Sequence, residues 1–241
     1  MSRSLCQATT ELLLWCQDRQ IKLLVRHIPG RLNVLADRLS RISSPLQSEW
    51  SLKQVVAEQI FIQLGRPMTD LFATRLNNKL PLFVSPVADS SAWAVDAMSI
   101  PWENLFLYAF PPLKLIPQVL LKVQQTPCKL LLVAPLWPQR SWFPLLFSLL
   151  TDFPRALPPL PDLLSQAGGR FVYPNVQVMN LHPWALSSVD YERKSFLKRL
   201  QTSSRSLLGL QPGQSTMPNG ECSPIGVVDG ISIPAVPLFR K

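Results

Sequence analysis

The sequence predicts an α/β fold built on a parallel sheet. Two apolar segments, 104–110 (NLFLYAF) and 128–135 (CKLLLVAP), have the composition of buried strands, and prolines mark the end of each. Between them, 111–123 (PPLKLIPQVLLKV) begins with prolines and continues with the apolar spacing of an amphipathic helix. A helix between two buried strands is typical of a βαβ unit, whose strands are parallel. The 24 prolines exclude a bundle of long helices, because proline removes a backbone donor and breaks regular structure.

The N-terminal part of the chain is predicted to contain a helix, a strand and a second helix. The first helix spans 8–19, where apolar residues recur at helical spacing and two threonines can cap the start. A strand follows at 21–25, where apolar and basic residues alternate. After the Pro29–Gly30 turn, Asn33 is a suitable cap for a helix over 34–41.

A linker at 43–47 leads into a second domain, which we assign to 50–184. Apolar spacing over 51–64 predicts a helix, and the glycine and proline that follow would end it. The segment 68–73 (MTDLFA) is predicted to be the next strand. This domain is expected to be a small Rossmann-like unit with a parallel sheet.

The last part of the chain, 187–241, has the composition of a tail. It is basic and rich in proline, glycine and serine, with little apolar periodicity. We predict that it is largely disordered, with one basic-faced helix at 191–200.

Charge and cysteine content narrow the class of protein. The formal net charge of +9 favours an acidic partner, most often nucleic acid, although basic residues can also simply keep a chain soluble. The 4 cysteines are too scattered for a zinc site and fit a reducing compartment. The apolar stretches 130–135 and 143–150 fall short of the ~20 residues that span a bilayer. We expect an intracellular protein, in the nucleus or cytoplasm, with no membrane partner.

The segment 27–41 (HIPGRLNVLADRLSR) has features of a metal-dependent hydrolase. Asp37 would lie in the first turn of a helix, where backbone amides favour the ionised carboxylate that a divalent metal requires. His27 precedes the turn and could swing toward a neighbouring site. Such a pair suits metal-assisted phosphodiester hydrolysis. The alternative is an ordinary capped helix with a solvated aspartate.

This segment resembles the C-terminal motif of the ribonuclease H domain in retroelement polyproteins. The matching residues are His27, Gly30, Asn33, Ala36, Asp37, Leu39, Ser40 and Arg41. The resemblance implies that 1–44 is the C-terminal remnant of such a domain, that Asp37 is the last of its four metal-binding acids and that His27 is its loop histidine. An intact domain would use Mg²⁺. The other three acids have no counterpart here, so we expect no cofactor and no nuclease activity from this chain alone.

A longer resemblance covers about residues 5–184. It rests on the order of four segments, 50–86, 94–102 (AVDAMSIPW), 108–123 (YAFPPLKLIPQVLLKV) and 130–146 (LLLVAPLWPQRSWFPLL). In this order the chain is similar to the region that follows ribonuclease H in DIRS-like retrotransposons, which use a tyrosine recombinase. The histidine and arginine group of a recombinase is absent beyond Trp184. We therefore interpret the chain as a fragment of a reverse transcriptase and ribonuclease H polyprotein, with weak nucleic-acid binding as its expected residual property.

The middle region also resembles phage-type DNA adenine N6-methyltransferases. The residues that match are Asp70, Asn77, Asp96, Ala97, Met98, Trp102, Pro111 and Pro112. The resemblance implies S-adenosylmethionine binding around Asp70, Asp96, Pro111 and Pro112. Phe110 and Leu113 replace the family's polar and aromatic active-site residues, so the target amine would lose its hydrogen-bond acceptor and the base its stacking partner. We expect methyl transfer to be lost.

Three residues are candidates for contact with nucleic acid. Arg140 and Trp142 lie where a loop should follow a buried strand, and Lys114 lies beside the double proline. The alternative for the tryptophan is a place in the core.

Two alternatives to an inactive polyprotein fragment stay open. The first is a divergent S-adenosylmethionine-dependent DNA adenine methyltransferase. The second is a domesticated scaffold that binds protein through the apolar remnant of the nuclease sheet, which a stable oligomer would indicate.

Overall fold

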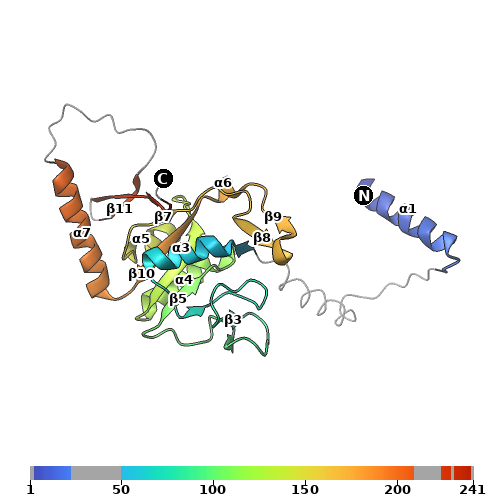
Figure 1. Ribbon diagram of the computed structural model, residues 1–241, viewed down its shortest axis with the longest axis horizontal. Coiled ribbons are helices and arrows are strands. Elements are labelled where there is room, and N and C mark those ends of the chain that lie inside the picture. The colour runs from blue at the N-terminus through green and yellow to red at the C-terminus, as the bar shows by residue number, and fades with distance from the viewer. Residues whose placement is uncertain (1–2, 23–49, 209–223, 229–230, 240–241) are drawn as a thin grey trace. The chain divides into compact units, whose positions relative to one another are not determined.

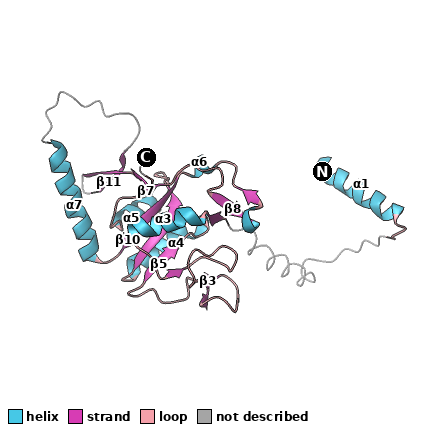
Figure 2. Ribbon diagram, in the orientation of Figure 1, coloured by secondary structure: helices cyan, strands magenta, loops and turns pink. Residues whose placement is uncertain are grey.

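The computed structural model describes residues 3–22, 50–208, 224–228 and 231–239 (Figure 1). The chain divides into two units, Met1–Ser44 and Pro45–Lys241, and each is considered by itself. The second unit contains both helices and strands (Figure 2), so the predicted mixed α/β class is confirmed, with several small sheets of which some are parallel. None of the described helices is long and apolar enough to cross a membrane.

The described part of the first unit is one helix, α1 (Arg3–Asp18). The predicted helix is therefore confirmed, but it begins earlier, so Thr9 and Thr10 lie within it and do not cap it. Residues 21 and 22 have no regular structure. The rest of the predicted strand, the second helix, the linker and both motif residues, His27 and Asp37, lie outside the described residues.

The centre of the second unit is a four-stranded sheet in the order β10-β6-β5-β2. Its strands are β2 (Thr69–Asp70), β5 (Phe106–Ala109), β6 (Lys129–Pro135) and β10 (Leu181–Ser187). The first three are parallel to one another and β10 runs antiparallel to β6. Between β5 and β6 the chain forms a 3₁₀ turn, η2 (Leu113–Leu115), and helix α4 (Ile116–Gln125), which confirms the predicted βαβ unit.

Two further strands extend the parallel arrangement beyond β2. These are β3 (Val84–Ser85) and β4 (Ala94–Val95), which pair in parallel. A parallel bridge joins Asp70 to Phe83, and the amide of Asp70 donates to the carbonyl of Leu82 at 2.9 Å. These contacts place β3 beside β2. The strands therefore lie in the order β4-β3-β2-β5-β6-β10, and the direction of chain progress reverses between β2 and β5.

Both faces of this sheet are buried. Along β6, Leu130 and Leu132 contact the core that contains α4, whereas Leu131 and Val133 contact the core that contains α3. Helix α3 (Gln54–Leu64) crosses one face (Figure 1), and α5 (Phe143–Ser148) joins α4 on the other. Continuous apolar strands are what two covered faces require.

A second, three-stranded sheet has the order β1-β8-β9. The other elements that precede β10 are β1 (Ser51–Leu52), β7 (Arg155–Ala156), β8 (Leu164–Gln166), η3 (Ala167–Gly169), β9 (Phe171–Val172) and α6 (Val176–Met179). The helix predicted over 51–64 begins only at Gln54, because β1 pairs with β8 instead.

The expectation of a largely disordered tail is wrong for the residues described there. The helix predicted at 191–200 is confirmed as part of α7 (Asp190–Leu208), but the strands β11 (Pro224–Val228), β12 (Ile231–Pro234) and β13 (Val236–Pro237) were not expected. Ile233 is fully buried in the α4-side core, and Leu238 is buried in the α3-side core. The side-chain amide of Gln63 donates to the carbonyl of Leu238. The C-terminal strands are therefore part of the fold. Their apolar segments are too short to be recognised from the sequence, and it is the contacts with the two cores that show their role.

The burial of Ile233 gives a test of the C-terminal strands. We expect Ile233→Ala to lower the free energy of unfolding by roughly 2 to 5 kcal/mol, because it leaves a cavity in the core. Val227→Ala is the control, since this side chain lies in the same hairpin and is 64% exposed. Urea unfolding measures both, and equal midpoints for the two variants would show that 224–239 is not packed on the domain.

Candidate functional site

A cavity of about 320 Å³ lies at the carboxyl ends of β2 and β5. Its volume is at the lower end of the range for small-molecule sites, and its walls are mainly apolar. The residues that line it are Leu71, Phe72, Pro86, Asp96, Ala97, Met98, Pro112, Leu115 and Gln118. They come from the segments that follow β2, β3, β4 and β5, and from the start of α4.

The strand order explains why a cavity forms here. The chain leaves β2 toward β3 and β4, but it leaves β5 toward β6 on the opposite side. At the carboxyl edge of the sheet, the connections that leave β2 and β5 therefore run in opposite directions. This is the position at which open α/β sheets bind ligands.

Asp96 supplies the only carboxylate among the lining residues. Its backbone has a left-handed φ of 57°, which directs the chain from β4 into a tight turn. One carboxylate oxygen, Oδ1, accepts the amide of Met98 at 3.0 Å, and the amide of Asp96 donates to the carbonyl of Ser85 at 2.9 Å. Among the described residues, no group donates a hydrogen bond to its other oxygen, Oδ2. The exposed carboxylate can thus accept a bond from a ligand.

The loop after Asp96 is anchored from within. Trp102 is fully buried, and its indole nitrogen donates to the carbonyl of Ala97 at 2.9 Å. Residues 96–102 therefore form one compact loop, which begins at the exposed Asp96 and ends at the buried Trp102.

Asp70 lies at the end of β2 but does not line the cavity. It is 2% exposed, and its Oδ2 accepts the amide of Lys79 at 2.9 Å. Asp70 is in register with Tyr108 on β5, so the two side chains share the face that α3 covers. Burial raises the pKa of Tyr108 well above its usual value, and the Asp70 charge adds to this effect. Burial also lowers the pKa of Lys79, which the Asp70 carboxylate opposes.

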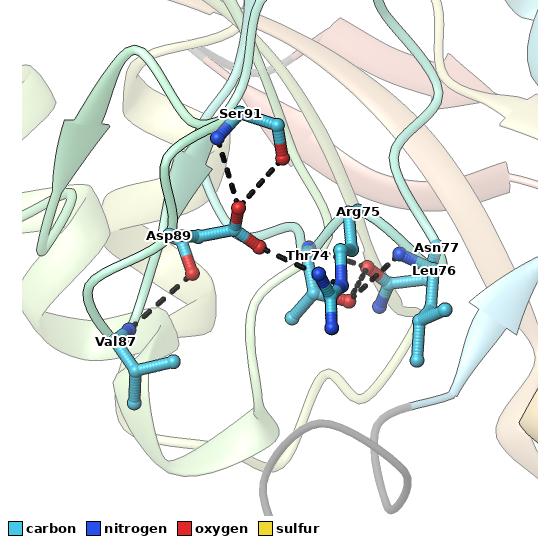
Figure 3. Close-up of polar contacts among 8 residues, drawn as sticks. Thr74, Arg75, Leu76, Asn77, Val87, Asp89 and Ser91 are labelled. Atoms are coloured by element: carbon cyan, nitrogen blue, oxygen red, sulfur yellow. Dashed lines mark hydrogen bonds and ion pairs between the residues drawn. The ribbon is translucent and has the colours of Figure 1, made fainter.

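Asn77 closes the loop that follows β2 (Figure 3). Its side-chain oxygen accepts the backbone amide of Thr74 at 2.6 Å and the Thr74 hydroxyl at 3.0 Å. A neighbouring loop is closed in the same way, because Asp89 accepts the amide of Ser91 at 2.9 Å and its hydroxyl at 2.6 Å. These hydrogen bonds lower the pKa of the Asp89 carboxyl. Both loops are thus shaped by local polar contacts.

The structure brings together some predicted site residues and separates others. Asp96 and Pro112 both line the cavity. Pro111, which precedes Pro112 in the sequence, is buried and does not line it. Asp70 lies on the face of the sheet that α3 covers. Gln118 is a cavity residue that the sequence reasoning missed. A polar residue on an amphipathic helix carries no signal that distinguishes a ligand contact from a solvated one.

Of the three residues predicted to contact nucleic acid, two are exposed and the tryptophan is buried. Trp142 is only 9% exposed and packs in the core against Phe143, so it is not available for base stacking. Arg140 is exposed, and its guanidinium lies 5.2 Å from the ring of Trp137. Lys114 is exposed on η2. The prediction for the tryptophan is corrected to a core role.

A shallower hollow of about 520 Å³ lies at the opposite edge of the sheet, beside α7. Its charges are paired within the protein: Lys129 Nζ lies 2.5 Å from Glu192, and Arg199 lies 3.7 Å from Asp152. A ligand there would have to displace these pairs. The cavity at the carboxyl edge is therefore the stronger candidate.

Within the described ranges, no group of three or more histidine, cysteine, aspartate and glutamate side chains could hold a metal ion. No protein-family model matches the chain, and no curated protein matches it either. Function is therefore inferred from the site itself and from the resemblances in the sequence.

The contacts of Asn77 generate a test of its structural role. Asn77→Ala would leave the buried amide of Thr74 without an acceptor, so we expect a loss of about 1–3 kcal/mol in unfolding free energy. Asn77→Asp keeps the acceptor and is expected to stay within about 1 kcal/mol of the original chain. Thermal or urea unfolding checks both, and an alanine variant as stable as the aspartate variant would contradict this role.

Proposed function

We propose that the chain is part of a DIRS-like retrotransposon polyprotein whose α/β unit is a nucleoside-binding domain without methyl-transfer activity. One observation carries the proposal: Asp96 and Pro112, both matched in the methyltransferase resemblance, line one cavity where the strand order reverses.

The strand order supports a Rossmann-like interpretation. Numbered along the chain from β2, the parallel strands lie in the order 3-2-1-4-5, which is the order of doubly wound nucleotide-binding sheets. The antiparallel β10 completes the far edge beside β6. This arrangement is what a methyltransferase-like domain requires, although here loops replace helices between β2, β3 and β4.

The cavity suits a nucleoside that carries no phosphate. Asp96 can accept hydrogen bonds from ribose hydroxyls, as an acidic residue does in dinucleotide-binding folds, while apolar walls such as Leu71 and Met98 can contact a base. No lysine or arginine lines the cavity to neutralise a phosphate, and the carboxylate would repel one. S-adenosylmethionine carries no phosphate, and its cationic sulfur, which supplies a methyl group when the cofactor is bound, is compatible with the Asp96 carboxylate.

The chain lacks the polar and aromatic active-site residues that methyl transfer would need. Phe110 is half-buried and packs against the α3-side core, and Leu113 is 40% exposed at the start of η2. Neither side chain can accept a hydrogen bond from a target amine, and leucine offers no flat face to a flipped base. The domain would therefore bind its ligand without acting on a base.

The chain also lacks most of the acidic residues that ribonuclease H activity would need. Of the four acids in the family's metal site, only Asp37 has a counterpart, and both it and His27 lie outside the described residues. Two-metal hydrolysis needs several carboxylates that converge on the ions. We propose that Asp37 contributes to Mg²⁺ binding only where the other acids are supplied.

Isothermal titration with S-adenosylmethionine tests the cavity. We expect the chain to bind, and Asp96→Asn to weaken binding about tenfold or more, since hydrogen bonds to a charged group contribute roughly 1.5–3 kcal/mol. Asparagine can still accept the amide of Met98, so the turn is preserved. Asp18→Asn, which makes the same substitution at an exposed position of α1, is the control.

Two results would contradict this part of the proposal. Absence of binding heat at millimolar cofactor would exclude the nucleoside site. Transfer of a labelled methyl group to single- or double-stranded DNA would show that the domain is an active methyltransferase despite Phe110 and Leu113.

A second candidate function, weak nucleic-acid binding, is favoured by α7. Between residues 190 and 200 it carries the basic residues Arg193, Lys194, Lys198 and Arg199. The side chain of Lys194 is 73% exposed. Its Nζ lies 4.0 Å from Oδ2 of Asp190, so the ion pair is long, solvated and weak. With the net charge of +9, such a helix can neutralise phosphates in a salt-dependent way.

Charge reversal on α7 tests this second function. We expect Lys194→Glu combined with Lys198→Glu to weaken binding of single-stranded DNA about tenfold at low salt and to reduce its salt dependence by about 1–2 in log–log slope. Arg75→Glu combined with Arg170→Glu makes the same charge change elsewhere. Mobility-shift titrations measure both, and equal losses in the two variants would indicate a general charge effect with no role for α7.

A further inference from the structure

Lys122 connects α4 to the loop that carries Asp96. Its ammonium donates to the carbonyl of Met98 at 2.6 Å and to the carbonyl of Ile100 at 2.7 Å. The same ammonium lies 4.9 Å from the centre of the Trp102 ring, close enough for a cation–π contact. One side chain from a core helix therefore contacts three residues of the 96–102 loop.

Met98 transmits this contact to the ligand side. Its carbonyl accepts the Lys122 bond, its amide donates to Asp96 Oδ1 at 3.0 Å, and the residue itself lines the cavity. The peptide groups on the two sides of Met98 are thus held by Lys122 and by Asp96. A shift of the hydrogen bond between Lys122 and the Met98 carbonyl would therefore change the direction in which the Asp96 carboxylate points.

Trp102 fixes the far end of the same loop. It is fully buried, and its indole donates to the carbonyl of Ala97, which also lines the cavity. The carbonyls of residues 97, 98 and 100 are therefore satisfied by only two side chains. Burial lowers the pKa of Lys122, and the charges of Glu103 and Asp96 oppose that change.

We infer that Lys122 is a positioning residue that holds the 96–102 loop, and with it Asp96, in the arrangement that receives the ligand. This inference rests on the proposed nucleoside site. Lys122 does not line the cavity, so it acts only through Met98 and the loop. A site whose acid is held in place by second contacts binds more tightly, because less freedom is lost on binding.

The test compares three full-length variants of the chain. Lys122→Met keeps the apolar stem and removes the three donors, Lys122→Arg keeps a charged donor, and Lys114→Met removes an exposed lysine just before α4 as a control. The measurements are S-adenosylmethionine affinity by titration, amide hydrogen exchange of residues 96–102, and urea unfolding.

We expect Lys122→Met to accelerate exchange of the 96–102 amides and to raise the Kd about tenfold, the order expected when a charged hydrogen bond is lost. Lys122→Arg should recover part of both effects, and Lys114→Met should match the original chain. Exchange in β5 and β6 should stay unchanged in every variant.

The outcomes separate this inference from the function on which it rests. If the original chain fails to bind the cofactor, the proposed nucleoside site is wrong. Faster exchange of the 96–102 loop in Lys122→Met would even then establish that Lys122 holds this loop. Loop exchange and affinity equal to those of the original chain would overturn the inference. Faster exchange throughout the sheet, with no recovery by arginine, would also overturn it, since Lys122 would then support the whole fold.

Discussion

Between β2 and β5 the chain reverses its progress across the sheet, and the candidate site depends on this reversal. Loops that leave the two strands in opposite directions cannot pack over the same edge, so space remains between them. Because both faces of the strands are buried, side chains near their ends are held in place. The same geometry excludes a site in the middle of the sheet, which apolar side chains fill.

The two cores that enclose the sheet draw on distant parts of the chain. The α4-side core includes Trp184 of β10, Phe196 of α7 and Ile233 of β12, whereas the α3-side core includes Leu238. Gly226 lies so close to the ring of Phe147 that a side chain at this position would force the ring to move. The C-terminal strands thus close both sides of the domain that the βαβ unit begins. A chain ending after α7 would leave both cores incomplete.

The residues on which the proposed methyltransferase resemblance rests divide into two groups by their surroundings. Asp70 and Asn77 each accept backbone amides of the loop after β2, so their presence is explained by the shape of that loop. Asp96 also accepts an amide, but it remains exposed in a cavity. Matching residues therefore need not share a role. The proposed loss of methyl transfer agrees with this division, because a fold can retain loop-forming residues after its reactive positions have become apolar.

Local sequence determined the β5-α4-β6 unit and α3, because long apolar periods and flanking prolines or glycine specify such elements without distant partners. Local sequence did not determine β10, whose Pro183 argues against a strand unless the strand lies at an edge, as it does beside β6. Nor could it show that Trp142 is buried, that β11–β13 belong to the core, or that Lys122 reaches the Asp96 loop. For the site, the sequence supplied Asp96 and Pro112 but not Gln118 or the separation of Asp70. Short strands and single side chains acquire their roles from contacts between residues far apart in the chain, and only the tertiary structure decides those contacts.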